Sequence, residues 1–159
     1  EGSTIGLSIV HDQSELSSAL ELAFLHGKEV ILEQYIQGRE LTVSIVGEQV
    51  FPIVDIRPSH ELYDYECKYT EGMSAYECPA KLSSKLTKEI QQTAKKIFQI
   101  LGCKNYGRID FLLDSDGESW FLEVNTLPGM TKTSLVPKAF KAAGGSFEEL
   151  IKRIIEETD

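Results

Sequence analysis

Apolar and polar positions alternate in two neighbouring runs of the chain, residues 106–113 and 119–124, and this pattern predicts a β-hairpin. The tetrapeptide Asp114-Ser115-Asp116-Gly117 separates the two runs, and its glycine can adopt the positive φ that a tight turn needs. We therefore expect two antiparallel strands joined by a short turn.

Side chains on a strand point alternately to its two faces, so Arg108 and Asp110 share one face of the first strand. If Leu113 pairs with Glu118 across the turn, Arg108 lies opposite Glu123. In that register the side chains expected together on one face are Asp110, Glu123 and Asn125, with six apolar side chains on the other face.

The polar face of this hairpin has two interpretations, a solvated face of a half-buried hairpin or a binding site. Leu112 and Phe121 would share this face, with Phe121 opposite Asp110, which indicates that something covers it. Two carboxylates and an amide suit Mg²⁺, which proteins hold with few carboxylates plus phosphate oxygens. Arg108 beside them suits a phosphate or a developing oxyanion. The sequence therefore predicts a metal–phosphate site.

Helix signals flank the hairpin on both sides. Asp12 with Glu15, and Ser146 with Glu149, have the spacing of a capping box at a helix start. Ser83 or Ser84 is expected to cap a third helix, which ends at Gly102. The apolar stripe expected on that third helix is Leu86, Ile90, Ala94, Ile97 and Leu101. Further strands are expected at residues 7–10, 30–35, 40–46 and 49–57.

Composition narrows the class of protein. The net charge of −9 and the pI near 4.9 argue against a nucleic-acid-binding surface, which needs clustered Lys and Arg. No apolar run approaches the roughly 18 residues that a membrane span needs, so no membrane partner is expected. Cys67, Cys78 and Cys103 lack the paired spacing of a metal site. We interpret them as reduced thiols of a cytoplasmic protein.

Four segments together carry a family resemblance. Gly107 to Asp110 and Phe121 to Thr131 resemble the signature of the D-alanine–D-alanine ligases, which belong to the ATP-grasp superfamily. Glu1 to Gly6 and Tyr63 to Tyr69 resemble two further motifs of that family, in the same order. The match covers essentially all of the 159 residues. Family members have an amino-terminal domain and more central-domain sequence upstream, so residues 1–159 are expected to be the carboxy-terminal part of a longer ligase.

The resemblance implies an α+β fold, a mostly antiparallel sheet with helices covering one side. It also implies a two-step reaction, in which ATP phosphorylates the carboxylate of one D-alanine and the amine of a second D-alanine attacks the acyl phosphate. The product, D-alanyl-D-alanine, is a peptidoglycan precursor. The implied partners are ATP, D-alanine and two Mg²⁺ ions, with Mn²⁺ as an alternative metal, and a homodimer is compatible with the family.

The site residues follow from the resemblance as well. The metal ligands are expected to be Asp110, Glu123 and Asn125. The nucleotide is expected to contact Glu33, Tyr35, Ile36, Glu40 and Lys68. Substrate contacts are expected from Tyr69, Gly129, Ser134 and Leu135, and catalytic roles from Ser3, Arg108 and Ser134.

The resemblance assigns some of these residues specific tasks. The carboxylate of Glu40 would accept hydrogen bonds from the ribose hydroxyls, and Lys68 would reach the γ-phosphate. Tyr69 favours a dipeptide product, since ligases that use a hydroxy acid lack this tyrosine pattern. Ser134 and the backbone of Leu135 would bind the carboxylate of the second D-alanine.

The residues alone leave plainer interpretations open. Glu33 and Glu40 could be solvated strand-end acids, Lys68 could form a loop salt bridge, and Ser134 could simply cap a helix. Three other functions also remain: a different ATP-grasp carboxylate–amine ligase, a non-catalytic divalent-cation module, and an inactive fragment of the ligase.

Overall fold

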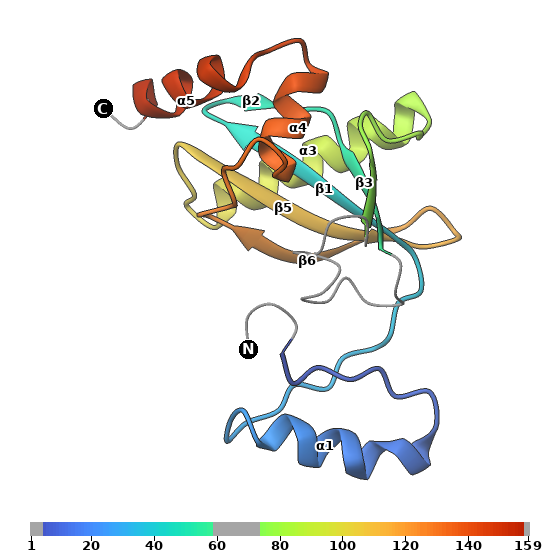
Figure 1. Ribbon diagram of the computed structural model, residues 1–159. Coiled ribbons are helices and arrows are strands. Elements are labelled where there is room, and N and C mark those ends of the chain that lie inside the picture. The colour runs from blue at the N-terminus through green and yellow to red at the C-terminus, as the bar shows by residue number, and fades with distance from the viewer. Residues whose placement is uncertain (1–4, 59–73, 158–159) are drawn as a thin grey trace. The chain divides into compact units, whose positions relative to one another are not determined.

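The computed structural model describes residues 5–58 and 74–157 (Figure 1). The chain divides into two compact units. The first unit comprises Glu1–Ile36 and Pro58–Ala75, and the second comprises Gln37–Arg57 and Tyr76–Asp159. Within the described ranges no helix is long and apolar enough to cross a lipid bilayer.

The described part of the first unit is built around one helix. A short 3-10 helix, η2 (Gln13–Glu15), leads into α1 (Leu16–Phe24). The predicted capping box is confirmed. The Asp12 carboxylate accepts the Ser14 backbone N–H at 2.8 Å, and the Glu15 carboxylate accepts the Asp12 backbone N–H at 3.4 Å. The Ser14 hydrogen bond holds the pKa of Asp12 below its ordinary value.

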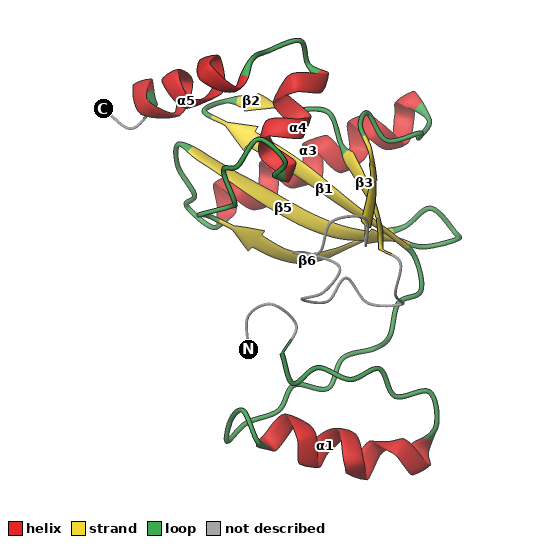
Figure 2. Ribbon diagram, viewed as in Figure 1, coloured by secondary structure: helices red, strands yellow, loops and turns green. Residues whose placement is uncertain are grey.

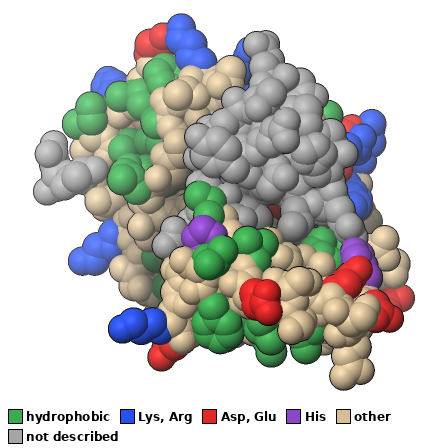
Figure 3. Space-filling view, turned by 60° about the horizontal axis from the view of Figure 1, so that its bottom comes forward, with side chains coloured by type: hydrophobic (Ala, Val, Ile, Leu, Met, Phe, Trp, Pro, Cys, Tyr) green, Lys and Arg blue, Asp and Glu red, His purple; other side chains and the backbone are tan. Residues whose placement is uncertain are grey.

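Two strands expected in this unit, residues 7–10 and 30–35, are not strands in the structure. A strand exists only as part of a hydrogen-bonded ladder, and residues 5–36 contain no paired strand. Hydrophobic side chains also remain exposed on this unit, as Figure 3 shows in green. The large ones include Leu22, Phe24, Leu25, Ile31 and Leu32. No residue of α1 is fully buried, and Leu16, Leu20 and Ala23 are partly buried on one face of the helix.

The second unit is organised by a sheet of six strands, shown in yellow in Figure 2. The strands are β1 (Arg39–Val46), β2 (Gln49–Val50), β3 (Val54–Pro58), β4 (Ser74–Glu77), β5 (Tyr106–Leu113) and β6 (Ser119–Asn125). Their spatial order is β4-β3-β1-β5-β6, and β2 pairs with β1. Strand β1 is antiparallel to β2, β3 and β5, and β5 is antiparallel to β6. The expected strand 49–57 is thus two short strands, and β4 lies at the end of the connection expected between residues 58 and 79.

The β5–β6 hairpin is confirmed, but its register at the turn differs from the expected one. Leu113 pairs with Ser119, not with Glu118. The reason lies in Asp114, whose Oδ1 accepts the Glu118 backbone N–H at 2.8 Å and thereby keeps Glu118 in the turn. Gly117 has the positive φ that the turn requires, 84°.

A β-bulge between Asp110 and Phe111 changes the register a second time. Phe111 lies opposite Phe121, with 6.2 Å between their ring centroids, and Asp110 lies opposite Glu123. The expected pairs of Asp110 with Phe121 and of Arg108 with Glu123 are therefore wrong. Leu122 is the extra residue of the bulge, and it moves Phe121 off the polar face while Glu123 stays on it.

Helix α3 (Ser84–Ile100) covers one face of the sheet. Ser83 caps it by accepting the Leu86 backbone N–H at 3.2 Å. Its buried side chains include Phe98, whereas Leu101, expected in the stripe, is 58% exposed. Leu101 is the C-cap, one residue beyond the last helical residue, and the core does not cover its side chain. The core under this helix comprises Leu41, Val43, Ile45, Ile53, Ile90, Ala94, Phe98, Ile109, Phe111 and Leu113.

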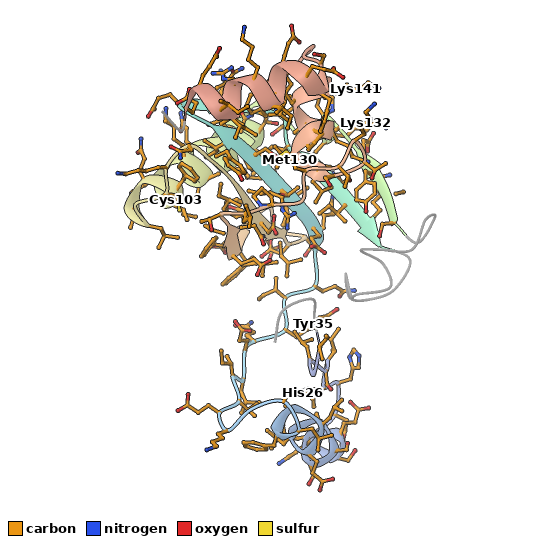
Figure 4. The ribbon with its side chains drawn as sticks, turned by 60° about the vertical axis from the view of Figure 1, so that its left-hand side comes forward. His26, Tyr35, Cys103, Met130, Lys132 and Lys141 are labelled. Atoms are coloured by element: carbon orange, nitrogen blue, oxygen red, sulfur yellow. The ribbon has the colours of Figure 1, made fainter. Side chains whose placement is uncertain are left out.

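Helices α4 (Leu135–Ala142) and α5 (Phe147–Glu156) complete this unit. Figures 1 and 4 show α3 and α4 on opposite sides of the sheet, so helices cover both faces where one was expected. The ring of Phe140 packs against the ring of Phe51, with 5.0 Å between their centroids. The capping box of Ser146 and Glu149 is confirmed, and Leu150 is buried, although Ile155 is 59% exposed.

Candidate metal–phosphate site

Three rows of side chains cross β1, β5 and β6 on one face of the sheet. In the middle row Thr42 lies opposite Asp110, and Asp110 lies opposite Glu123. Strand alternation places the neighbouring rows on the same face. These rows are Glu40, Leu112 and Trp120 on one side, and Ser44, Arg108 and Asn125 on the other. The sheet therefore aligns the expected ribose acid with the expected metal acids and Arg108.

Arg108 and Asp110 form a bidentate ion pair. Arg108 donates from Nε to Asp110 Oδ1 at 2.9 Å and from Nη2 to Oδ2 at 2.8 Å. Their side chains are 17% and 7% exposed. Two parallel charge-assisted bonds fix both the position and the plane of the carboxylate.

Asn125 links the two carboxylates of the site. Its Nδ2 donates to Asp110 Oδ2 at 2.9 Å and to Glu123 Oε1 at 3.0 Å. Two acids placed close together repel each other, and the amide N–H groups offset part of this repulsion. The prediction that Asp110, Glu123 and Asn125 share one face is confirmed.

The donor set fits Mg²⁺ that is completed by another ligand. The described ranges contain no group of three or more His, Cys, Asp and Glu side chains that could enclose a metal. Two carboxylates and an amide are an incomplete cage, which matches the way Mg²⁺ is held by few protein oxygens plus phosphate. The N–H groups of Arg108 and Asn125 bond both oxygens of Asp110, and a cation would compete with them for these oxygens.

A second polar cluster lies where the loop after β6 enters α4. Ser134 is the N-cap residue, as predicted, but its side chain makes no capping bond. Pro137 occupies the third helical position and has no N–H to offer. The Ser134 hydroxyl instead accepts the Thr131 backbone N–H at 3.1 Å and bonds Thr131 Oγ1 at 2.8 Å. The simple capping role therefore fits Ser134 poorly.

The loop packs tightly against this serine. A Cβ added to Gly129 would lie 3.0 Å from Ser134 Oγ, so the close approach favours glycine there. Lys138 donates from Nζ to the carbonyl of Thr133, and partial burial lowers the pKa of this lysine. Leu135 is buried, which leaves its backbone as the group available at the helix start. A helix N-terminus with a hydroxyl and an ammonium nearby suits an anion such as a carboxylate.

The remaining expected site residues belong to the first unit or lie outside the described residues. Glu33, Tyr35 and Ile36 belong to the first unit, and Tyr35 is labelled in Figure 4. The rings of Tyr35 and His11 meet edge-on, with 6.1 Å between their centroids. Ser3, Lys68 and Tyr69 lie outside the described residues.

Sequence analysis missed Thr42 and Ser44, which are fully buried polar residues on β1. The alternation in 40–46 carried a signal for them, since they share a face with Glu40. Their nearness to Asp110 and Arg108 depends on the pairing of β1 with β5, which alternation does not reveal.

Sequence comparison gives a family for this arrangement. Residues 1–156 match the family model described as D-ala D-ala ligase C-terminus. A D-alanine–D-alanine ligase of Syntrophotalea carbinolica is 48% identical over 98% of this chain and 50% of that protein. One of Pseudoalteromonas translucida is 43% identical over 99% of this chain and 52% of that protein. The chain spans about half the length of the curated relatives that it matches.

Solved structures agree with the sequence match. The D-alanine–D-alanine ligase of Bacillus anthracis complexed with ATP superposes with a TM-score of 0.79 at 39% identity, covering 94% of this chain and 49% of that chain. The VanG D-Ala:D-Ser ligase of Enterococcus faecalis superposes with a TM-score of 0.83 at 36% identity. The match covers 98% of this chain and 46% of that chain. The chain belongs to the family of D-alanine–D-alanine ligase carboxy-terminal domains.

Proposed function

We propose that this chain is the carboxy-terminal catalytic portion of an ATP-dependent D-alanine–D-alanine ligase that acts in the cytoplasm. The observation that carries the proposal is the middle row of the sheet, Asp110 beside Glu123, with Arg108 bonded to Asp110 at 2.8 and 2.9 Å. Two acids and a forked cation on one face are suited to phosphoryl transfer. The relatives and the solved structures that this chain resembles are ligases of the same class.

Asp110, Glu123 and Asn125 would hold Mg²⁺ in this proposal. The ion, when bound, neutralises charge on the phosphates during phosphoryl transfer. Arg108 lies on the same face as these ligands. We assign its guanidinium to the acyl phosphate and to the oxyanion that forms when the second amine attacks.

We assign the ribose, the adenine and the D-alanine substrates to residues outside this centre. Glu40, two positions along β1 from Thr42, would accept hydrogen bonds from the ribose. Ser134, Gly129 and the backbone of Leu135 would hold the carboxylate of the second D-alanine. The proposal also assigns the adenine to Glu33, Tyr35 and Ile36, the γ-phosphate to Lys68, and the amino-acid substrate to Ser3 and Tyr69.

A second candidate differs only in the attacking substrate. The D-Ala:D-Ser ligase of Enterococcus faecalis superposes as well as the D-alanine–D-alanine ligases do. The hydroxyl-rich cluster of Thr131, Thr133 and Ser134 could also accept the side chain of D-serine. Tyr69, which favours a dipeptide product, is compatible with both amines.

A competition assay on the full-length parent protein separates the candidates. The enzyme is incubated with ATP, Mg²⁺ and D-alanine, alone and with equimolar D-serine or D-lactate, and the products are identified by mass spectrometry. We expect D-alanyl-D-alanine in every case. Predominant D-alanyl-D-serine would favour the second candidate, and no ADP-forming ligation of any kind would refute both. The 159-residue chain alone should give no dipeptide, because half a cleft does not hold both substrates within near-attack distance.

A further inference from the structure

Thr42 touches the same carboxylate that Arg108 and Asn125 contact. It is completely buried, and its hydroxyl donates to Asp110 Oδ1 across 2.5 Å. The carbonyl of Ile109 lies farther from the same hydroxyl, at 3.3 Å. A hydroxyl has one proton, and a length of 2.5 Å is typical of an O–H···O⁻ bond. The proton therefore belongs to the bond with Asp110.

The four hydrogen bonds to Asp110 differ in where their donors come from. Arg108 and Asn125 donate from their side chains on β5 and β6, and both share the exposed side of the hairpin with Glu123. Thr42 donates from β1, where its own side chain has no solvent exposure. A cation arriving between Asp110 and Glu123 competes with the N–H donors of Arg108 and Asn125 for the carboxylate oxygens. The Thr42 hydroxyl bonds Oδ1 from β1 and is not one of the side-chain N–H donors in that competition.

Thr42 is also held more firmly than the other donors. Its backbone is paired on both sides, with Val54 of β3 and with Asp110 of β5. A β-branched side chain has few χ1 rotamers, so the hydroxyl has little freedom to turn away. Arginine and asparagine side chains reach Asp110 through more rotatable bonds. The fixed donor is therefore the one on β1.

We propose that Thr42 is a positioning residue, which holds the Asp110 carboxylate in its metal-binding orientation when a cation displaces the N–H groups of Arg108 and Asn125 from the Asp110 oxygens. This inference rests on the metal site of the proposed function. Hydrogen bonds from outside a ligand set orient the ligands, and losing one typically weakens metal binding about 10–100-fold. We expect a loss of that size when the hydroxyl of Thr42 is removed.

The chain offers a matched control on the same strand. Ser44 is completely buried, lies one row from Thr42 on the same face, and sits opposite Arg108. Its Oγ has no hydrogen-bond partner among residues 5–58 and 74–157. Ser44→Ala thus removes a buried hydroxyl from β1 without removing a bond to the metal acid.

The experiment measures Mn²⁺ binding to the full-length ligase by electron paramagnetic resonance, with a non-hydrolysable ATP analogue present. Thr42→Val keeps the shape of the side chain and removes the hydroxyl, and we expect Mn²⁺ to bind about 10–100-fold more weakly. Thr42→Ser keeps the hydroxyl and should restore binding to within a few-fold of the wild type. Ser44→Ala should bind Mn²⁺ as the wild type does. The half-saturating Mg²⁺ concentration in turnover should follow the same order.

Each outcome decides a separate question. Wild-type Mn²⁺ affinity in folded Thr42→Val, or an equal loss in Ser44→Ala, would overturn the role of Thr42. If Thr42→Val does not fold, Thr42→Ala against Thr42→Ser makes the same comparison, and equal affinities in that pair would overturn the inference. Asp110→Asn tests the metal site itself. Unchanged Mn²⁺ binding in that variant would refute the proposed metal site, whatever Thr42 does.

Discussion

The Arg108 guanidinium donates two parallel hydrogen bonds, of 2.9 and 2.8 Å, to the carboxylate of Asp110, which lies two residues farther along β5. Residues at i and i+2 of a strand share a face, which makes this pairing possible within one strand. The acid expected to bind a metal is thus bonded to the cation expected to stabilise an oxyanion. Separate measurements of metal binding and of ligation in variants of each residue therefore distinguish the two roles.

Arg108→Lys in the full-length ligase should slow peptide formation while ATP still binds. Lysine keeps the positive charge but loses the planar fork that bonds both Asp110 oxygens. Loss of one oxyanion donor costs about 10²–10³ in rate in other enzymes. Single-turnover ligation and the ATP dissociation constant, measured separately, check this expectation. A collapse of ATP affinity with normal ligation of bound substrate would contradict the assigned role.

Glu123→Gln should abolish metal-dependent ATP turnover. An amide supplies one oxygen acceptor and no charge, so it replaces a carboxylate poorly as a Mg²⁺ ligand. Turnover is followed as phosphate release across a Mg²⁺ titration. Glu118→Gln removes the same charge from the exposed turn of the hairpin and should leave the titration unchanged. Equal behaviour of the two folded variants would remove Glu123 from the metal site.

Phe98→Ala should destabilise the protein strongly and Leu101→Ala should not. Phe98 is 5% exposed within the core under α3, whereas Leu101 is 58% exposed beyond the helix. Truncating a buried phenylalanine typically costs about 3–5 kcal/mol, and an exposed substitution about 0.5 kcal/mol or less. Urea unfolding of both variants measures the difference. Similar losses would mean that Leu101 belongs to the buried stripe after all.

Asp114→Asn should lower stability at neutral pH and lose its effect in acid. Hydrogen bonds from Trp120 Nε1 and from the Glu118 backbone hold the pKa of Asp114 below its ordinary 3.8. A carboxyl group whose pKa is lowered on folding raises the free energy of unfolding at pH values above its ordinary pKa of 3.8. This contribution disappears as the pH falls through the folded-state pKa.

The measurement is the unfolding midpoint of wild type and Asp114→Asn across this acid range. Their difference should shrink as the pH falls. Asp116→Asn is the control, because it removes a charge from the same turn without removing the acceptor of the Trp120 bond. A pH-independent difference for Asp114→Asn would contradict the linkage.

Local patterns in the sequence predicted much of this molecule correctly. Alternation identified the hairpin and the shared face of Asp110, Glu123 and Asn125, and short spacings identified both capping boxes. These features depend on residues a few positions apart, whose relative geometry the backbone period sets. The family motifs likewise lie in short segments of the chain.

Tertiary structure decided the features that depend on which strands pair. The hairpin register follows from the Asp114 side chain and from the bulge at Leu122. The alternation of apolar and polar residues predicts neither of these features. Thr42 meets Asp110 only because β1 pairs with β5 across 68 positions of sequence. Residues 7–10 and 30–35 have a strand-like pattern but no partner ladder among residues 5–36. The side-chain pattern of a strand depends on neighbouring residues, whereas its hydrogen bonds join it to another part of the chain. The sequence therefore determined which side chains share a face of a strand. The folded structure determined which residues of other strands those side chains contact.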